Sequence, residues 1–292
     1  MRIAILGDDR PAVVADDGQT LRPVRRSGRW NQDTDLLSAS WWVRMCGDPN
    51  TVPQAEELDE PIATASAFLR APVLNPSKII ACASNYSAHV AEMKETVLPR
   101  TSTDAPAWLL DFDVFLKAPS SIIGPCDAVQ LPPTATAANV EVHHESELAI
   151  VIGRGGRNIT ADDALTHIFG YVPSLDMTLR GNGDRSRRKS YDTFTPVGPW
   201  VTTYDEISDP HALDIKLTVN GTVRQDVNTA AMTVRIPDII EYVSAVMTLN
   251  PGDLILTGAP PGVGPVHAGD VMNVHITQLG RLQIPVQAQP AP

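Results

Sequence analysis

Three acidic residues have the type and spacing to hold a metal ion. Glu145 and Glu147 directly precede an apolar, largely β-branched run, residues 148–152, which predicts a buried strand. Residues two apart on a strand point to the same face, so the two carboxylates repel unless a cation or a proton lies between them. Asp176 could add a third carboxylate, and oxygen ligands of this kind suit a hard divalent ion. The alternative interpretation is an exposed acidic strand start, with Asp176 capping a turn.

A histidine and a glutamate three residues apart could form a general base. The stretch 85–92 predicts the start of a short helix, on which His89 and Glu92 share a face. A carboxylate that orients an imidazole makes it an effective proton acceptor. The alternative is a surface His–Glu pair, which the spacing alone favours.

Five cations are concentrated in one ten-residue stretch. They are Arg180, Arg185, Arg187, Arg188 and Lys189. Such a run usually forms a solvated loop, but guanidinium groups also bind carboxylates in a bidentate geometry. The run could therefore hold an anionic substrate, and both interpretations remain open.

Strands would position most of these residues. An Asn-Gly pair predicts a hairpin at residues 217–225. Apolar or alternating runs predict further strands at residues 78–82, 114–117, 148–152, 254–257 and 271–277.

Helices are predicted at a few places, and the chain divides into three parts. A near capping box of Thr160 and Asp163 predicts a helix over 160–168, and Pro237 begins another with an apolar stripe. A helix is also predicted from Asp33.

The three predicted parts of the chain are a small N-terminal domain (1–70), a catalytic domain (71–287) and a frayed tail (288–292).

The composition limits the classes of function. With 292 residues, 43% hydrophobic and 20% charged, the chain suits an ordinary globular protein with one large and one small domain. Its net charge of −11 would repel nucleic acid. No apolar run approaches the roughly 20 residues of a membrane span, and the first residues predict a strand and a turn rather than a signal peptide. Three separated cysteines without a CxxC pair fit a reducing cytoplasm.

Taken together, the motifs resemble the fumarylacetoacetate hydrolase family over roughly residues 75–287. In the family's order they are Asn85-Tyr86-x-x-His89-x-x-Glu92, Phe115-Leu-Lys117-x-Pro119-Ser, Glu145-x-Glu147-Leu-Ala, Gly170-Tyr171 through Asp176, Lys189-Ser-x-Asp192-Thr, Gly198-Pro199-Trp200, Val219-Asn-Gly221 with Gln225, and Leu249-x-Pro-Gly-Asp253 through Thr257-Gly-x-Pro260. Each motif alone is weak, but their joint occurrence in this order is highly specific.

The resemblance implies a fold and a metal. The expected fold is α+β and strand-rich, a mixed β-sandwich roll with a small N-terminal domain. One Mg²⁺ or Mn²⁺ would be held by Glu145, Glu147 and Asp176.

The resemblance also implies roles for individual residues. His89 and Glu92 would lie on a short lid helix and activate a water, and Lys189 would hold or polarise the substrate. The other residues of these motifs that we expect to bind substrate are Arg180, Gln225, Thr257 and Gly258.

Members of the family cleave or rearrange 2-oxo and 1,3-diketo acids and are commonly homodimers. We therefore expect a cytoplasmic, homodimeric, metal-dependent hydrolase that cleaves a C–C bond in a small acylpyruvate-like acid, of the kind met in aromatic compound catabolism. Neither nucleic acid nor a membrane is expected as a partner. One alternative is a decarboxylase or isomerase of a 2-oxo dicarboxylic acid on the same scaffold. Another is a non-catalytic binding protein, against which the intact carboxylates and the His–Glu pair argue.

Several positions depart from the family pattern. Ala259 stands where a threonine is usual, Leu175 replaces an asparagine before the third carboxylate, and Gly181 replaces an aspartate. His143 and His144 replace more typical aspartate and tyrosine residues. These departures concern the substrate more than the metal.

Overall fold

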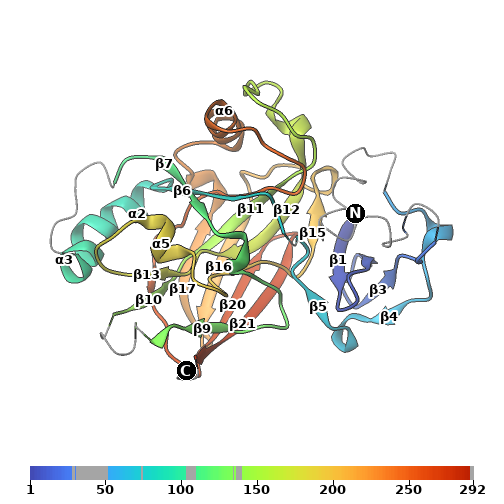
Figure 1. Cartoon of the computed structure of the whole chain (residues 1–292), viewed down its shortest axis with the longest axis horizontal. Coiled ribbons are helices and arrows are strands. Elements are labelled where there is room, and N and C mark those ends of the chain that lie inside the picture. The colour runs from blue at the N-terminus through green and yellow to red at the C-terminus, as the bar shows by residue number, and fades with distance from the viewer. Residues whose placement is uncertain are drawn as a thin grey trace.

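The computed structural model describes residues 1–27, 30, 52–73, 75–102, 110–133, 135 and 140–289. The helix predicted from Asp33 and the last residues of the predicted tail lie outside these ranges. Within them the chain is strand-rich, with short helices beside the sheets (Figure 1). None of the described helices is long and apolar enough to cross a membrane.

An eleven-stranded sheet has β11 (Ser146–Ile152) and β12 (Ile168–Leu175) near its centre. Every residue of both strands is buried. Successive side chains of a strand point to opposite faces, so Leu148 packs into one apolar core and Ala149 into another. The apolar run in the sequence therefore correctly predicts a strand that is covered on both faces.

The other strands of this sheet are β1 (Arg2–Leu6), β2 (Pro11–Val14), β3 (Thr20–Pro23), β4 (Ile62–Ala63), β5 (Leu69–Arg70), β6 (Ile79–Ala83), β7 (Asp113–Lys117), β15 (Val201–Thr203) and β18 (Leu254–Leu256). The order is β4-β3-β2-β1-β15-β12-β11-β18-β6-β7, with β5 beside β1. Only the β18–β6 pair among these is parallel, within the part of the chain described.

A five-stranded sheet packs against the centre of the large sheet. Its members are β9 (Val129–Leu131), β16 (Asp214–Val219), β17 (Thr222–Asn228), β20 (Val271–Ile276) and β21 (Gly280–Ala288). In β20 the alternating residues Met272, Val274 and Ile276 are fully buried, and they share a core with Leu148 of β11. The two sheets form the expected mixed β-sandwich.

The predicted hairpin between β16 and β17 is confirmed. Asn220 and Gly221 have φ values of 51° and 80°, as a tight turn between twisted strands requires. The strand pairs on both sides are antiparallel.

Two small sheets complete the strand inventory of the described ranges. One contains β13 (Thr178–Leu179), β10 (Val142–His144) and β19 (Gly264–Pro265). The other pairs β14 (Thr195–Pro196) with β8 (Ile122–Ile123) in parallel.

The N-terminal strands extend the large sheet. β1 pairs with β2 on one side and with β15 on the other, where Arg2 lies opposite Thr202. The division of the chain at residue 70 therefore stays a prediction. At the other end, β21 continues to Ala288, which pairs with Leu131 of β9, so the strand reaches one residue into the predicted tail.

The described helices are short. They are α2 (Ser87–Glu92), a π-helical turn (Met93–Val97), α3 (Leu98–Thr101), α5 (Arg185–Lys189) and α6 (Ile236–Val246), with 3₁₀ turns at Ala55–Glu57, Thr64–Ser66, Pro119–Ser121, Ala164–His167, Tyr204–Glu206 and Thr229–Ala231. In α6, Ile239, Ile240 and Val243 are buried, as the predicted stripe requires, but Val246, which the same stripe placed in the core, is exposed at the end of the helix.

The helix predicted over residues 160–168 is wrong. Thr160 and Asp163 do bond to each other, but they close only a turn. A single 3₁₀ turn follows, and Ile168 already begins β12 because Ile168 and Phe169 are buried in the sheet. Sheet packing overrides the local capping signal here.

Candidate metal centre and active site

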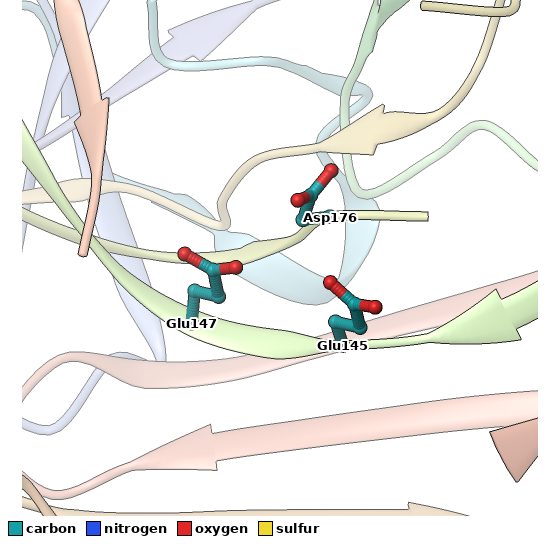
Figure 2. A group of neighbouring side chains, drawn as sticks. All are labelled: Glu145, Glu147 and Asp176. Atoms are coloured by element: carbon teal, nitrogen blue, oxygen red, sulfur yellow. The ribbon is translucent and has the colours of Figure 1, made fainter. Parts of the chain in front are cut away.

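The register of β11 and β12 brings the three carboxylates together. Ser146 lies opposite Leu175, so Glu145, just before β11, meets Asp176, just after β12. The backbone N–H of Asp176 donates to the carbonyl of Glu145 at 2.8 Å. Figure 2 shows the side chains of Glu145 and Glu147 rising from one strand towards Asp176. One ligand atom from each lies within 4.8 Å of the others, and all three residues are buried.

Cations surround this group. Glu145 accepts a hydrogen bond from Arg180 at 2.7 Å and from Lys189 at 2.6 Å, and Lys189 also bonds Asp176. Burial alone would raise the pKa of Glu145, but the charges of Lys189 and Arg180 outweigh it and hold that pKa well below its usual range.

Glu147 differs from its two neighbours. Its Oε2 accepts the backbone N–H of Gly258 at 2.6 Å, whereas its buried Oε1 has no hydrogen-bond partner among the described residues. Burial and the neighbouring Asp176 raise the pKa of Glu147 well above its ordinary value. A buried carboxylate oxygen without a partner is costly. Three convergent carboxylates, one with a bare oxygen, fit a hard divalent cation.

Lys117 holds one carboxylate in place. Its buried Nζ bonds Asp176 Oδ1 and donates to the carbonyl of Phe194 at 2.9 Å. This leaves Asp176 Oδ2 directed towards Lys189. Lys117 belongs to the Phe115-Leu-Lys117 motif, but the sequence does not indicate its contact with Asp176, because the two residues are 59 positions apart.

His89 and Glu92 form the predicted pair. His89 Nδ1 donates to Glu92 Oε2 at 3.1 Å, and the backbone N–H of Gly262 donates to both carboxylate oxygens of Glu92 at 3.0 and 3.1 Å. His89 is buried in α2, whose two ends adjoin loops or irregular helix. With Nδ1 carrying the proton, Nε2 is the free base.

One cavity is lined by a residue from each of these two groups, His89 and Glu145. It has a volume of about 350 Å³, and its wall includes His89, Glu145, Arg180 and Lys189. Residues of α2, the π-helical turn and α3 form one side, and α5 with the loop before it forms another. Phe115 of β7 also lines it, with its ring centroid 5.3 Å from Lys189 Nζ.

The predicted substrate-binding residues divide into two sets. Arg180 lies on the cavity wall. Gln225 and Thr257 do not belong to the described wall, because both are fully buried and hydrogen-bonded within the protein. Gln225 accepts from Ser146 N at 2.9 Å and donates to Pro260 O at 2.8 Å.

Thr257 and Gly258 also support the carboxylates. Thr257 Oγ1 donates to Leu148 O at 2.9 Å, and Gly258 N holds Glu147. These contacts brace the strand that carries Glu145 and Glu147. A direct contact of Gln225, Thr257 or Gly258 with the substrate stays a prediction.

The basic run is neither a uniform solvated loop nor a single cluster. Asp184 caps α5, its side chain accepting from Arg187 N at 3.3 Å. Arg188 and Lys189 are buried and line the cavity, whereas Arg187 is exposed. A helix of five residues is too short to show a helical repeat of apolar residues in the sequence. The signal for α5 in the sequence is therefore its N-cap residue, Asp184.

Residues 78–287 match the family described as fumarylacetoacetate (FAA) hydrolase, C-terminal. The chain belongs to this family.

Several members are similar over most of their length. The maleylpyruvate hydrolase of Aquipseudomonas alcaligenes is 39% identical over 228 residues, 78% of this chain and 78% of its own. A mitochondrial oxaloacetate tautomerase of Xenopus laevis is 40% identical over 238 residues, 77% of this chain and 70% of its own. The crystal structure of maleylpyruvate hydrolase from Sphingobium sp. SYK-6, in complex with manganese(II) and pyruvate, superposes with a TM-score of 0.80 at 36% identity, covering 99% of this chain and all of that one.

Proposed function

We propose that this chain is a divalent-metal-dependent hydrolase that cleaves the C–C bond of an acylpyruvate-like 1,3-diketo acid. The observation that carries the proposal is the shared cavity, whose wall includes both His89, which Glu92 orients, and Glu145 of the carboxylate group. Relatives named maleylpyruvate hydrolase, one solved with manganese and pyruvate, support the same reaction.

Glu145, Glu147 and Asp176 would hold one Mg²⁺ or Mn²⁺. When bound, the ion supplies Lewis-acid polarisation and a template for the carboxylate and keto oxygens of a 2-oxo acid. The bare Oε1 of Glu147 supports this assignment.

Glu92, His89 and Lys189 have separate roles in the hydrolysis. Glu92 orients His89, whose Nε2 accepts a proton from the attacking water. The water oxygen bonds to the acyl carbonyl carbon, the adjacent C–C bond breaks, and its electron pair remains on the pyruvate fragment as an enolate. Lys189 places positive charge beside that fragment. The proton that His89 took from the water is then transferred to the enolate carbon, which gives pyruvate.

A tautomerase, isomerase or decarboxylase of a 2-oxo dicarboxylic acid is the second candidate. The relative named oxaloacetate tautomerase favours it. This chemistry also uses an enolate, but it needs no attacking water.

A substrate panel separates the two candidates. Acylpyruvates, oxaloacetate and unsaturated dicarboxylic 2-oxo acids are each assayed with Mg²⁺ and Mn²⁺. We expect hydrolysis of at least one acylpyruvate. Turnover of oxaloacetate with none of any acylpyruvate would overturn the hydrolase assignment in favour of the second candidate.

Finer features of the assignment are proposals as well. We propose a cytoplasmic homodimer with no nucleic-acid or membrane partner, which light scattering and fractionation would test. We also propose that residues 71–287 carry the chemistry, because the residues that line the cavity lie between Cys82 and Ala259.

A further inference from the structure

Arg188 is a guanidinium buried in the wall of the cavity. It lies in α5 and is 8% exposed. Its Nε donates to Gly183 O at 3.1 Å and its Nη1 to Leu179 O at 3.2 Å. Across the described residues, no carboxylate forms an ion pair with it. Its hydrogen-bond acceptors in the described part of the chain are therefore backbone carbonyls, and Glu145 and Asp176 act on its charge only without direct contact.

The other buried cations of the site differ from Arg188. Arg180 and Lys189 each bond Glu145, and Lys117 bonds Asp176. The adjacent Arg187 is exposed, so water solvates it.

A buried charge without a counterion is energetically costly. Burial and the nearby Arg180 lower the pKa of Arg188, but a guanidinium keeps its proton in proteins. An anion in the cavity would offset this cost through charge-assisted hydrogen bonds.

The wall around Arg188 is open and positively charged. Gly181 and Gly183, with φ of 109° and 124°, place no side chain on it, and Arg185 adds a second guanidinium. The acidic residue of this loop, Asp184, is engaged at the start of α5, where it accepts from Arg187 N.

We propose that the substrate carries a second carboxylate, at the end of its acyl chain remote from the 2-oxo acid, and that Arg188 binds it. The inference rests on the proposed acylpyruvate substrate. The remote group is assigned to Arg188 because Glu145 and Asp176 bond Arg180, Lys189 and Lys117 but not Arg188. Arg188 is thus a residue that selects dicarboxylate substrates.

The test compares one acylpyruvate that ends in a carboxylate with its terminal amide. The wild-type enzyme should prefer the acid by about ten- to a hundredfold in kcat/KM, the effect of one charge-assisted hydrogen bond. Arg188→Gln should bring that ratio close to one, because the acid loses far more of its rate than the amide. Arg188→Lys should retain part of the preference, because it keeps the charge without the guanidinium fork.

Arg187→Gln is the matched control. It removes the same charge one residue away, from an exposed side chain, and should leave the ratio unchanged. Equal ratios for wild type and a folded Arg188→Gln or Arg188→Lys variant would overturn the inference, because a purely structural role would slow both substrates alike.

A binding measurement separates this inference from the proposed function. Calorimetry with Mn²⁺ compares 2-oxoadipate with 2-oxohexanoate, which have equal chain length and differ in the second carboxylate. Tighter binding of 2-oxoadipate that is lost in Arg188→Gln and reduced in Arg188→Lys supports the role of Arg188, even if no acylpyruvate is hydrolysed and the proposed function fails. Equal binding of the two acids by the wild type overturns the inference, even if acylpyruvates are hydrolysed.

Discussion

His89 Nδ1 lies 3.1 Å from Glu92 Oε2, and both oxygens of the same carboxylate accept the backbone N–H of Gly262. The imidazole is therefore oriented by a carboxylate that is itself fixed to the loop after β18. This arrangement leaves Nε2 of His89 as the free base on the cavity wall.

His89→Ala should reduce acylpyruvate hydrolysis by about 10²–10⁴-fold, the usual contribution of general-base catalysis. Mn²⁺ affinity should hardly change, because the three carboxylates are untouched. Glu92→Gln should do less harm, since the amide oxygen keeps the shape but supports a charged imidazole less well. Steady-state kinetics and Mn²⁺ titration measure both effects. Hydrolysis by His89→Ala at the wild-type rate would refute the assigned role.

Lys117 should stabilise the protein mainly by neutralising Asp176. Lys117→Met leaves a buried carboxylate short of one cation, a change that costs about 3–5 kcal/mol when a buried pair is broken. A bound divalent ion would replace much of that charge, so the loss of unfolding free energy should be larger in chelator than in saturating Mn²⁺.

Lys78→Met provides the comparison for Lys117. Lys78 pairs with the buried Asp253, which is not among the three metal-binding candidates, so its loss should destabilise the protein equally with and without Mn²⁺. Chemical denaturation in chelator and in saturating Mn²⁺ gives the loss of unfolding free energy for each of the two variants relative to the wild type. A metal-independent loss for Lys117→Met would contradict its assigned role.

Much of the site could be predicted from the sequence because strand geometry is local. The two-residue spacing of Glu145 and Glu147 fixes their common face, and the three-residue spacing of His89 and Glu92 does the same on α2. Contacts between distant parts of the chain could not be predicted. Nothing local indicates that Lys117 meets Asp176.

Burial of individual side chains was also beyond the sequence. Arg187 and Arg188 are adjacent and identical in type, yet only Arg188 is buried, because the short helix α5 turns it towards the cavity. In the same way, the motif that contains Gln225 does not indicate that its amide bonds Ser146 and Pro260.

His211 should make stability depend on pH. Its Nε2 accepts the backbone N–H of Ile236 at the start of α6 at 3.0 Å, so the imidazole must be neutral. Burial and the nearby Arg235 lower its pKa in the folded state. The unfolded chain then binds more protons, and this stabilisation is present above about pH 6.5 and is lost as the pH falls from there through the folded-state pKa.

His211→Gln keeps an acceptor that does not titrate. Its melting temperature should therefore fall less than that of the wild type between pH 7 and pH 5, by an amount corresponding to roughly 1 kcal/mol, the usual value of a helix cap. His143 and His144, whose pKa values are also lowered by burial, act equally in both proteins. Parallel melting curves across this range would exclude the role of His211.

The metal requirement tests the account most directly. Acylpyruvate hydrolysis is measured after exhaustive chelation and again after addition of Mg²⁺ or Mn²⁺, for the wild type and for Glu147→Ala. If Glu145, Glu147 and Asp176 hold the metal, chelation should abolish hydrolysis and either ion should restore it in the wild type. Glu147→Ala, which removes the unpartnered Oε1, should stay inactive with either ion. Full activity after chelation, or a Glu147→Ala variant with normal hydrolysis, would contradict the account.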